Sequence, residues 1–304
     1  MEPVLAIVNP ASSNGSTARF WPKARRALED AGVVLDVVMT EGPGHATALA
    51  RAAGLDGRKT ILYVGGDGTA NEVANGLLET PSCARPRLAA LPRGTGGDFP
   101  KSMGLAAGAE AAAARLLRGS ERTIDVAVST FVALDGSATR RHFINIADAG
   151  LGGYVAERVN RTSKVFGGFA SFLYSTISTF WNLENHEMSV TVDGVEVFTG
   201  RATTVAVCNG PRFGGGMLMS PDAKLDDGLL DIVVIGDMGK ADLLVSMRRL
   251  YNGTIFSHPK THLHRGKEVR VEARRPTPLE IDGEHPGTTP FHVWVEPLAL
   301  RVVV

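Results

Sequence analysis

The sequence has only two cysteines, Cys83 and Cys208, and neither lies in a CxxC or Cys/His spacing. This argues against a disulfide framework and against a structural zinc site. Lysine plus arginine equals aspartate plus glutamate, at 32 each, so no overall positive field would draw the chain to nucleic acid. No run reaches the roughly 20 apolar residues of a membrane-spanning helix, and no basic signal-peptide region opens the sequence. These absences predict a cytoplasmic protein that meets any membrane peripherally, at its inner face.

With 304 residues, 44% of them apolar, the chain is long enough for two domains. In its first part, short apolar runs alternate with helical patterns. The runs expected as strands are Val4–Val8, Val33–Met39, Thr60–Val64 and Leu88–Leu91. The helices expected after them span 20–31, 45–53, 70–79 and 106–118. Such alternation predicts a Rossmann-like α/β domain whose parallel sheet is covered on both faces and binds ligands at the carboxyl ends of its strands.

After about residue 124 the pattern changes to strands with few helices between them. The runs expected as strands are His142–Ala147, Met188–Val192, Thr203–Cys208, Leu229–Val234 and Val269–Ala273. We expect residues 1–124, completed by the C-terminal segment 291–304, to form the α/β domain, and residues 125–290 to form a β-rich, sandwich-like domain. Aromatic residues crowd 154–181, which predicts a helical insert that either packs into the core, the preferred interpretation, or touches a membrane surface.

The strongest local signal is TILYVGGDGTANEVANGL, in which a buried strand runs through a glycine-rich loop directly into a helix. Glycines let the backbone approach a phosphate closely, and Thr69 with Glu72 predicts a capping box that aims helix N–H groups at an anion. Asp67 would repel a phosphate unless a divalent cation lay between them, as in a magnesium-bound nucleotide. The glycines alone equally allow a plain strand–turn–helix corner. GxxxxGK[ST] is absent, which excludes a Walker-type loop.

A second segment, LPRGTGGDFPKSMGL, repeats this arrangement after the next strand. With NPASSNG, Thr40, FINIADAGLGG, PDAKLDDGLLDIVVI and IDGE, these segments make the chain resemble the lipid-kinase superfamily of diacylglycerol, ceramide and sphingosine kinases. The resemblance is closest to the soluble bacterial members and covers essentially the whole chain. It implies an NAD kinase/diacylglycerol kinase-like fold for the α/β domain, and a reaction that uses ATP and Mg²⁺.

The resemblance also implies a nucleotide site and an acidic network around a catalytic magnesium ion. That network would comprise Asp67, Asp98 and Asp125. The family's GTxND pattern has asparagine where this chain has Gly97, and alanine and arginine follow where this chain has Pro100 and Lys101, so the contacts of this loop are expected to differ. By position in the motifs, the nucleotide contacts would be Asn9, Pro10, Ala11, Ser12, Ser13, Thr40, Gly65, Gly66, Asp67, Gly68, Thr69, Ala70, Asn71 and Thr95.

Near the end of the chain, Asp282, Gly283 and Glu284 match the family's DGE motif. The resemblance implies that Glu284 is the base that takes the proton from the lipid hydroxyl, with Asp282 beside it in the catalytic set. Sphingosine kinases point instead to the aspartate of the GDG loop, so Asp67 is the rival base. From the residues alone, a DG hairpin with a merely solvated Glu284 stays open.

The segment PDAKLDDGL resembles the loop that binds a structural magnesium ion in the bacterial enzymes. The implied ligands are the Asp227 carboxylate and the backbone carbonyls of Lys224 and Leu229, which are oxygen donors of the kind a hard cation prefers. An acidic surface turn is the alternative. The histidines of SHPKTHLH lack acidic or cysteine partners and are expected in an ordinary loop.

The sequence thus predicts an ATP-dependent lipid kinase with ATP held between the two domains and diacylglycerol as the leading substrate. One alternative is an NAD kinase relative that phosphorylates a soluble dinucleotide. Another is a non-catalytic lipid-binding protein of the same fold. No nucleic-acid partner is expected, and the residues leave the choice between a monomer and a homodimer open.

Overall fold

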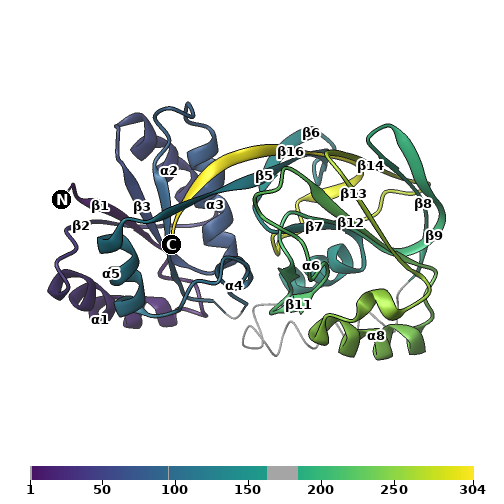
Figure 1. Cartoon of the computed structure of the whole chain (residues 1–304), viewed down its shortest axis with the longest axis horizontal. Coiled ribbons are helices and arrows are strands. Elements are labelled where there is room, and N and C mark those ends of the chain that lie inside the picture. The colour runs from purple at the N-terminus through teal and green to yellow at the C-terminus, as the bar shows by residue number, and fades with distance from the viewer. Residues whose placement is uncertain (1, 95, 163–183) are drawn as a thin grey trace. The chain divides into compact units, whose positions relative to one another are not determined.

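The computed structural model describes residues 2–94, 96–162 and 184–304 and divides the chain into two compact units. Unit 1 comprises Met1–Asp125 with Leu298–Val304, and unit 2 comprises Val126–Pro297. The chain passes between the units within two long strands, β5 (Glu121–Ala133) and β16 (Gly287–Val303) (Figure 1). The boundary expected after residue 290 therefore falls inside a strand that continues unbroken from unit 2 into unit 1.

Unit 1 is the predicted α/β domain, with a parallel sheet in the order β2-β1-β3-β4 and the end of β16 beside β4. Helices α1 and α5 cover one face of this sheet, and α2 and α3 cover the other (Figure 1). Its strands are β1 (Val4–Val8), β2 (Leu35–Met39), β3 (Thr60–Gly65) and β4 (Arg87–Pro92). Its helices are α1 (Ser16–Asp30), α2 (His45–Leu55), α3 (Asp67–Leu78), α4 (Asp98–Ser102) and α5 (Ala109–Arg118).

The local sequence explains these elements. The central strands are apolar on both faces, as a sheet covered by helices on both sides requires. Helix α1 places Trp21, Ala24 and Leu28 at helical spacing and buries them against the sheet. The helix ends where Gly32 takes a φ of 96°, a conformation that costs glycine little.

Unit 2 is the predicted β-rich, sandwich-like domain. Its strands run in the order β13-β12-β9-β8-β14-β16, with β7 also paired to β9, β15 paired to β7, and β5 paired to β6. The strands not yet given are β6 (Ala138–Phe143), β7 (Ile146–Gly150), β8 (His186–Val192), β9 (Val195–Cys208), β10 (Arg212–Phe213), β11 (Met217–Leu218), β12 (Leu230–Gly236), β13 (Thr261–Gly266), β14 (Glu268–Ala273) and β15 (Leu279–Ile281). The helices are α6 (Leu151–Thr162), α8 (Lys240–Asn252) and the short 3₁₀ turn η1 (Ile255–Ser257).

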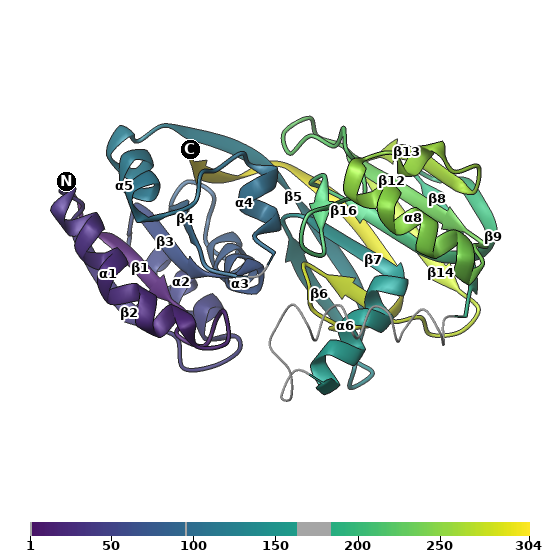
Figure 2. The ribbon, with the colours of Figure 1, turned by 90° about the horizontal axis from the view of Figure 1, so that it is seen from below.

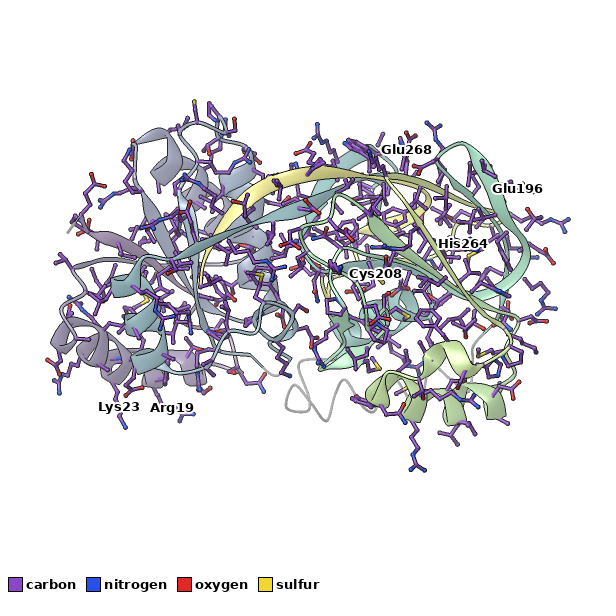
Figure 3. The ribbon with its side chains drawn as sticks, viewed as in Figure 1. Arg19, Lys23, Glu196, Cys208, His264 and Glu268 are labelled. Carbon is purple, nitrogen blue, oxygen red and sulfur yellow. The ribbon has the colours of Figure 1, made fainter. Side chains whose placement is uncertain are left out.

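Three sequence expectations for unit 2 need correction or limitation, and one helix was not expected. The strand expected at 142–147 is split into β6 and β7. His262 and His264 lie on β13 and not in a loop, and His264 is labelled in Figure 3. Helix α8, which the sequence analysis missed, packs Leu243 and Leu250 on the sheet face that includes β12 (Figure 2). The helical insert expected at 154–181 begins within α6, and its part from 163 onward lies outside the described residues.

The loop before β12 is held by Arg265 of β13. Its guanidinium contacts the carboxylates of Asp227 (Nη2 to Oδ2, 2.5 Å) and Asp231 (Nε to Oδ1, 2.7 Å). The other oxygen of Asp231 accepts the Ser220 hydroxyl at 2.6 Å, and the other oxygen of Asp227 accepts the Leu229 N–H at 3.2 Å. An arginine therefore supplies the positive charge that this acidic loop needs.

The structural magnesium ion implied by the resemblance stays a prediction. Both carboxylate oxygens of Asp227 already have partners, and Lys224 and Leu229 would add only backbone carbonyls. In the described parts of the chain, no group of three or more His, Cys, Asp or Glu side chains could hold a metal.

Replacing Arg265 with methionine should lower the free energy of unfolding by about 1–3 kcal/mol, because the nearly buried Asp231 carboxylate loses its cationic partner. Arg270→Met is the matched control. It breaks an ion pair with Glu268 in which both side chains are exposed, and should cost less than about 1 kcal/mol. Urea unfolding followed by circular dichroism measures both. A wild-type midpoint that drops on adding EDTA, with Arg265→Met no worse than the control, would contradict the arginine-held loop.

Candidate active site

The carboxyl ends of the parallel strands of unit 1 gather the residues assigned to the nucleotide. Asn9 follows β1, Thr40 follows β2 and Gly65 ends β3. Backbone pairing continues one residue beyond the strands. The Thr40 N–H donates to the Val8 carbonyl at 2.9 Å, and the Arg93 N–H donates to the Gly65 carbonyl at 2.6 Å. Ends of parallel strands meet at one edge of a sheet. The loops that begin there are therefore neighbours.

Asn9 connects the first loop to helix α3. Its Nδ2 donates to the Thr69 hydroxyl at 2.9 Å, and its Oδ1 accepts the Ala11 N–H at 3.0 Å. The Ser12 hydroxyl donates to the Asn9 carbonyl at 2.9 Å, and Ser13 takes a left-handed φ of 53°. The structure thus brings the Asn9–Ser13 loop and the start of α3 together, as the resemblance implied.

The loop after β3 contains Gly66, and the loop after β4 contains Gly94. These two glycines bring the two loops into backbone contact. A Cβ on Gly94 would lie 2.8 Å from the Gly66 Cα, and a Cβ on Gly65 would lie 2.4 Å from the Thr69 hydroxyl. Only glycine fits at positions 65 and 94. Gly66 is also the N-cap of α3 and has no side chain to accept first-turn N–H groups. Those groups are therefore placed to bind an anion.

The capping box expected from Thr69 and Glu72 is wrong. Helix α3 begins at Asp67, three residues earlier than the motif requires. The Thr69 hydroxyl accepts a hydrogen bond from Asn9, and Glu72 Oε2 accepts the N–H of Ala46 at the start of α2, at 3.1 Å. Tertiary contacts take both side chains, which leaves the glycine cap uncovered by either of them.

The carboxylates of Asp67 and Asp98 converge beside Gly96. Measured from a Cβ placed on Gly96, Asp67 Oδ2 lies at 3.0 Å and Asp98 Oδ2 at 3.2 Å. Asp67 Oδ1 also accepts the Phe99 N–H at 3.1 Å. Two carboxylates that approach the same point repel each other unless positive charge compensates them. Their oxygens fit a magnesium ion that takes its other ligands from phosphate and water.

Asp125 is the remaining member of the assigned acidic network. Asp125 is fully buried on β5 and accepts the Leu298 N–H at 2.7 Å, so its place in a magnesium network stays a prediction. Thr95 lies outside the described residues.

Burial, and then the charge of Asp67, raises the pKa of the Tyr63 phenol on β3 well above its ordinary value, so this phenol stays neutral.

Two cationic residues, Arg93 and Lys101, lie on either side of the glycines in the loop after β4. The sequence analysis gave neither a role. Lys101 Nζ donates to the Gly96 carbonyl at 2.6 Å. The Arg93 guanidinium lies over the Phe20 ring, 4.2 Å from its centre. Their signal was the pair of basic residues around the glycines in PRGTGGDFPK. Both put positive charge next to the loops that would hold phosphate.

In unit 2, β15 leads into the tight turn of the DGE motif. Ile281 N–H donates to the Glu284 carbonyl at 2.8 Å, and Glu284 N–H donates to the Ile281 carbonyl at 3.1 Å. Asp282 and Gly283 between them take φ values of 46° and 91°, as in a two-residue hairpin of type I′. The hairpin left open by the sequence is present.

Asp282 fixes this turn to the chain between β6 and β7. Its Oδ2 accepts the Ile144 N–H at 2.9 Å, and its Oδ1 accepts the N–H groups of Asn145 and Ile146 at 3.1 Å each. These bonds also explain why the strand expected at 142–147 is interrupted. A carboxylate that accepts three backbone N–H groups positions the turn, and the catalytic role of Asp282 stays a prediction.

Glu284 remains open to solvent. Its side chain is 43% exposed, and its Oε2 contacts Arg141 Nη2 at 2.7 Å. The ion pair orients the carboxylate, and the exposure leaves it accessible to a substrate hydroxyl. This geometry permits the role of general base that the resemblance implies.

Comparison with known proteins identifies both parts of the chain. The model of the "Diacylglycerol kinase catalytic domain" matches residues 3–129. The model of the "YegS C-terminal NAD kinase beta sandwich-like domain" matches residues 145–304.

Curated relatives extend the match over nearly the whole chain. The diacylglycerol kinase of Staphylococcus carnosus (strain TM300) is 28% identical over 284 residues, which cover 93% of this chain and 89% of the relative. The diacylglycerol kinase of Staphylococcus aureus (strain MRSA252) is 29% identical over 285 residues, covering 93% and 86%.

Solved structures agree with this assignment. A protein of Bacillus anthracis str. Sterne matches with a TM-score of 0.80 and 26% identity over 99% of this chain and 95% of that chain. A diacylglycerol kinase structure from the same strain, at 24% identity and a TM-score of 0.74, shares the fold. With both domain models matched in order along one chain, the protein belongs to the diacylglycerol kinase family, whose catalytic domain is followed here by a YegS-type C-terminal domain.

Proposed function

We propose that this kinase transfers the γ-phosphoryl group of ATP to a lipid hydroxyl, with diacylglycerol as the leading substrate and phosphatidic acid as the product. The observation that carries the proposal is the pair of carboxylates, Asp67 and Asp98, beside the glycine-capped N-terminus of α3. N–H groups aimed at an anion next to two acidic side chains suit a metal-bound triphosphate. The names of the staphylococcal relatives support diacylglycerol as the acceptor.

The residues of unit 1 would bind and orient the nucleotide. Magnesium-bound ATP supplies the transferable group and neutralises part of its charge. The backbone of the Gly65–Thr69 segment would hold the phosphates, with the Asn9–Ser13 loop and Thr40 beside it, and the carboxylates of Asp67 and Asp98 would hold the cation. Lys101 would add positive charge at the loop after β4.

Unit 2 would supply the base. Glu284 would accept the proton of the lipid hydroxyl, after at least one of its oxygens leaves the Arg141 guanidinium. Asp67 is the alternative base, but its contacts with the Phe99 N–H and its closeness to Asp98 suit a residue that holds a cation. In the described part of the chain, no helix is both long and apolar enough to cross a bilayer. The proposed lipid substrate would be met at the surface of the inner membrane.

Purified protein incubated with γ-labelled ATP and Mg²⁺ should transfer label to a lipid. The panel should include diacylglycerol, phosphatidylglycerol, sphingosine, ceramide and NAD in separate reactions. We expect label in phosphatidic acid. Label in another lipid would replace the substrate and keep the reaction. Label in NADP would support an NAD kinase-like activity, and no transfer under any condition would support a non-catalytic lipid-binding protein.

Replacing Glu284 with glutamine should reduce the turnover number by roughly 100-fold or more, because a neutral amide cannot accept the hydroxyl proton. Nucleotide affinity should change little, since the phosphate loops belong to unit 1. The matched control is Glu296→Gln, which breaks a similar ion pair with Arg140 (3.0 Å) and should retain activity. Steady-state kinetics and calorimetric titration with ATP measure both effects. Near-normal turnover of Glu284→Gln would refute the assignment and favour Asp67.

A further inference from the structure

Two acidic side chains are buried directly beneath the DGE turn, and neither is used in the mechanism above. Asp148 on β7 and Glu280 on β15 face each other in the register of the paired strands. Their exposed fractions are 1% and 7%. Among the described residues, no lysine, arginine or histidine forms an ion pair with either one. A buried carboxylate without a cation is costly, so another arrangement must satisfy this pair.

One oxygen of each carboxyl group accepts hydrogen bonds from its surroundings. Asp148 Oδ1 accepts the Thr204 hydroxyl of β9 at 3.0 Å and the Gly152 N–H, at the start of α6, at 3.1 Å. Glu280 Oε1 accepts the Gly283 N–H in the middle of the DGE turn. The pair therefore connects the turn to β9 and to α6.

The other two oxygens are Asp148 Oδ2 and Glu280 Oε2. Both are buried, and no N–H or O–H group of the described residues donates to them. They belong to residues that face each other across paired strands, so a hydrogen bond between the two carboxyl groups would satisfy both oxygens. Two ionised carboxylates have no proton to place in such a bond, whereas one protonated and one ionised group form a strong one. A Cβ on Gly152 would lie 1.8 Å from Asp148 Oδ2, so the glycine leaves room for this oxygen.

We propose that Asp148 and Glu280 share a single proton between Oδ2 and Oε2, and that this acid pair is the positioning device that holds the Glu284 turn through the Gly283 N–H. The role in catalysis rests on the proposed function of Glu284 as base. The shared proton itself does not, because it follows from the buried oxygens alone.

The turn has two internal anchors, and they act on different atoms. The Asp282 carboxylate holds the chain between β6 and β7 to the turn, whereas Glu280 holds the N–H of Gly283, next to Glu284. Because Gly283 takes a φ of 91°, its N–H points inward to the carboxyl group. Loss of the acid pair would therefore free the residue adjacent to the base while leaving the Asp282 anchor in place.

The electrostatic surroundings favour retention of one proton. Burial raises the pKa of Asp148 to about 6, and burial together with the charges of Asp148 and Asp282 raises the pKa of Glu280 well above its ordinary value. Cys208 of β9, in the interior of unit 2 (Figure 3), has a raised thiol pKa and stays neutral. Near neutral pH the pair thus carries one negative charge, and at alkaline pH it would carry two.

Glu280→Gln and Glu280→Ala separate the shared proton from mere packing. Glutamine can still accept the Gly283 N–H and donate to Asp148 without a titrating proton, so Glu280→Gln should keep activity and lose the alkaline decline of the wild-type pH profile. Glu280→Ala should lower the turnover number on the order of tenfold, through misplacement of Glu284, with the KM for ATP unchanged. Glu272→Ala, which removes an exposed carboxylate on β14, is the matched control and should resemble wild type.

Amide hydrogen exchange at Gly283 provides a readout that does not depend on kinase activity. Exchange should be slow in wild type and in Glu280→Gln, and on the order of tenfold or more faster in Glu280→Ala. If no kinase activity is found but this pattern holds, the acid pair stands and the proposed function fails. Equal exchange in all three proteins, or a wild-type alkaline decline retained in Glu280→Gln, would overturn the acid pair.

Discussion

The candidate site depends on one steric constraint, the backbone contact between Gly66 and Gly94. A side chain on Gly94 would collide with the neighbouring loop, because its Cβ would lie 2.8 Å from the Gly66 Cα. This contact draws the loop after β4 against the start of α3. As a result, Asp98 lies beside Asp67 next to helix N–H groups that have no side-chain cap. Two carboxylates and an anion-binding helix end are compatible only when a cation lies between carboxylate and anion.

In unit 2, buried acidic residues hold the DGE turn in place. Asp282 accepts three backbone N–H groups, and Glu280 accepts the Gly283 N–H, so both are used to hold a short turn from the inside. Glu284 is the member of the DGE segment that is left in solvent, where it contacts Arg141. One strand and its turn thus combine buried acids that position the backbone with an exposed acid that can react.

The sequence was sufficient for the fold class and for the loops of unit 1, because alternating apolar runs and glycine-rich strand ends are local signals. The sequence did not predict the side-chain partners that depend on tertiary contacts. Thr69 and Glu72 match a capping box, yet Asn9 and the start of α2 take their side chains. No local pattern indicated that Arg265, 38 residues after Asp227, contacts its carboxylate. The pairing of Asp148 with Glu280 joins residues 132 apart in the chain, which no local pattern records.

A crystal structure with magnesium and a non-hydrolysable ATP analogue tests the central claim most directly. The account predicts that the phosphates lie against the backbone of residues 65–69, with a magnesium ion between them and the carboxylates of Asp67 and Asp98. Phosphates bound elsewhere, or loops closed by side chains so that no nucleotide enters between Gly66 and Asn9, would contradict it.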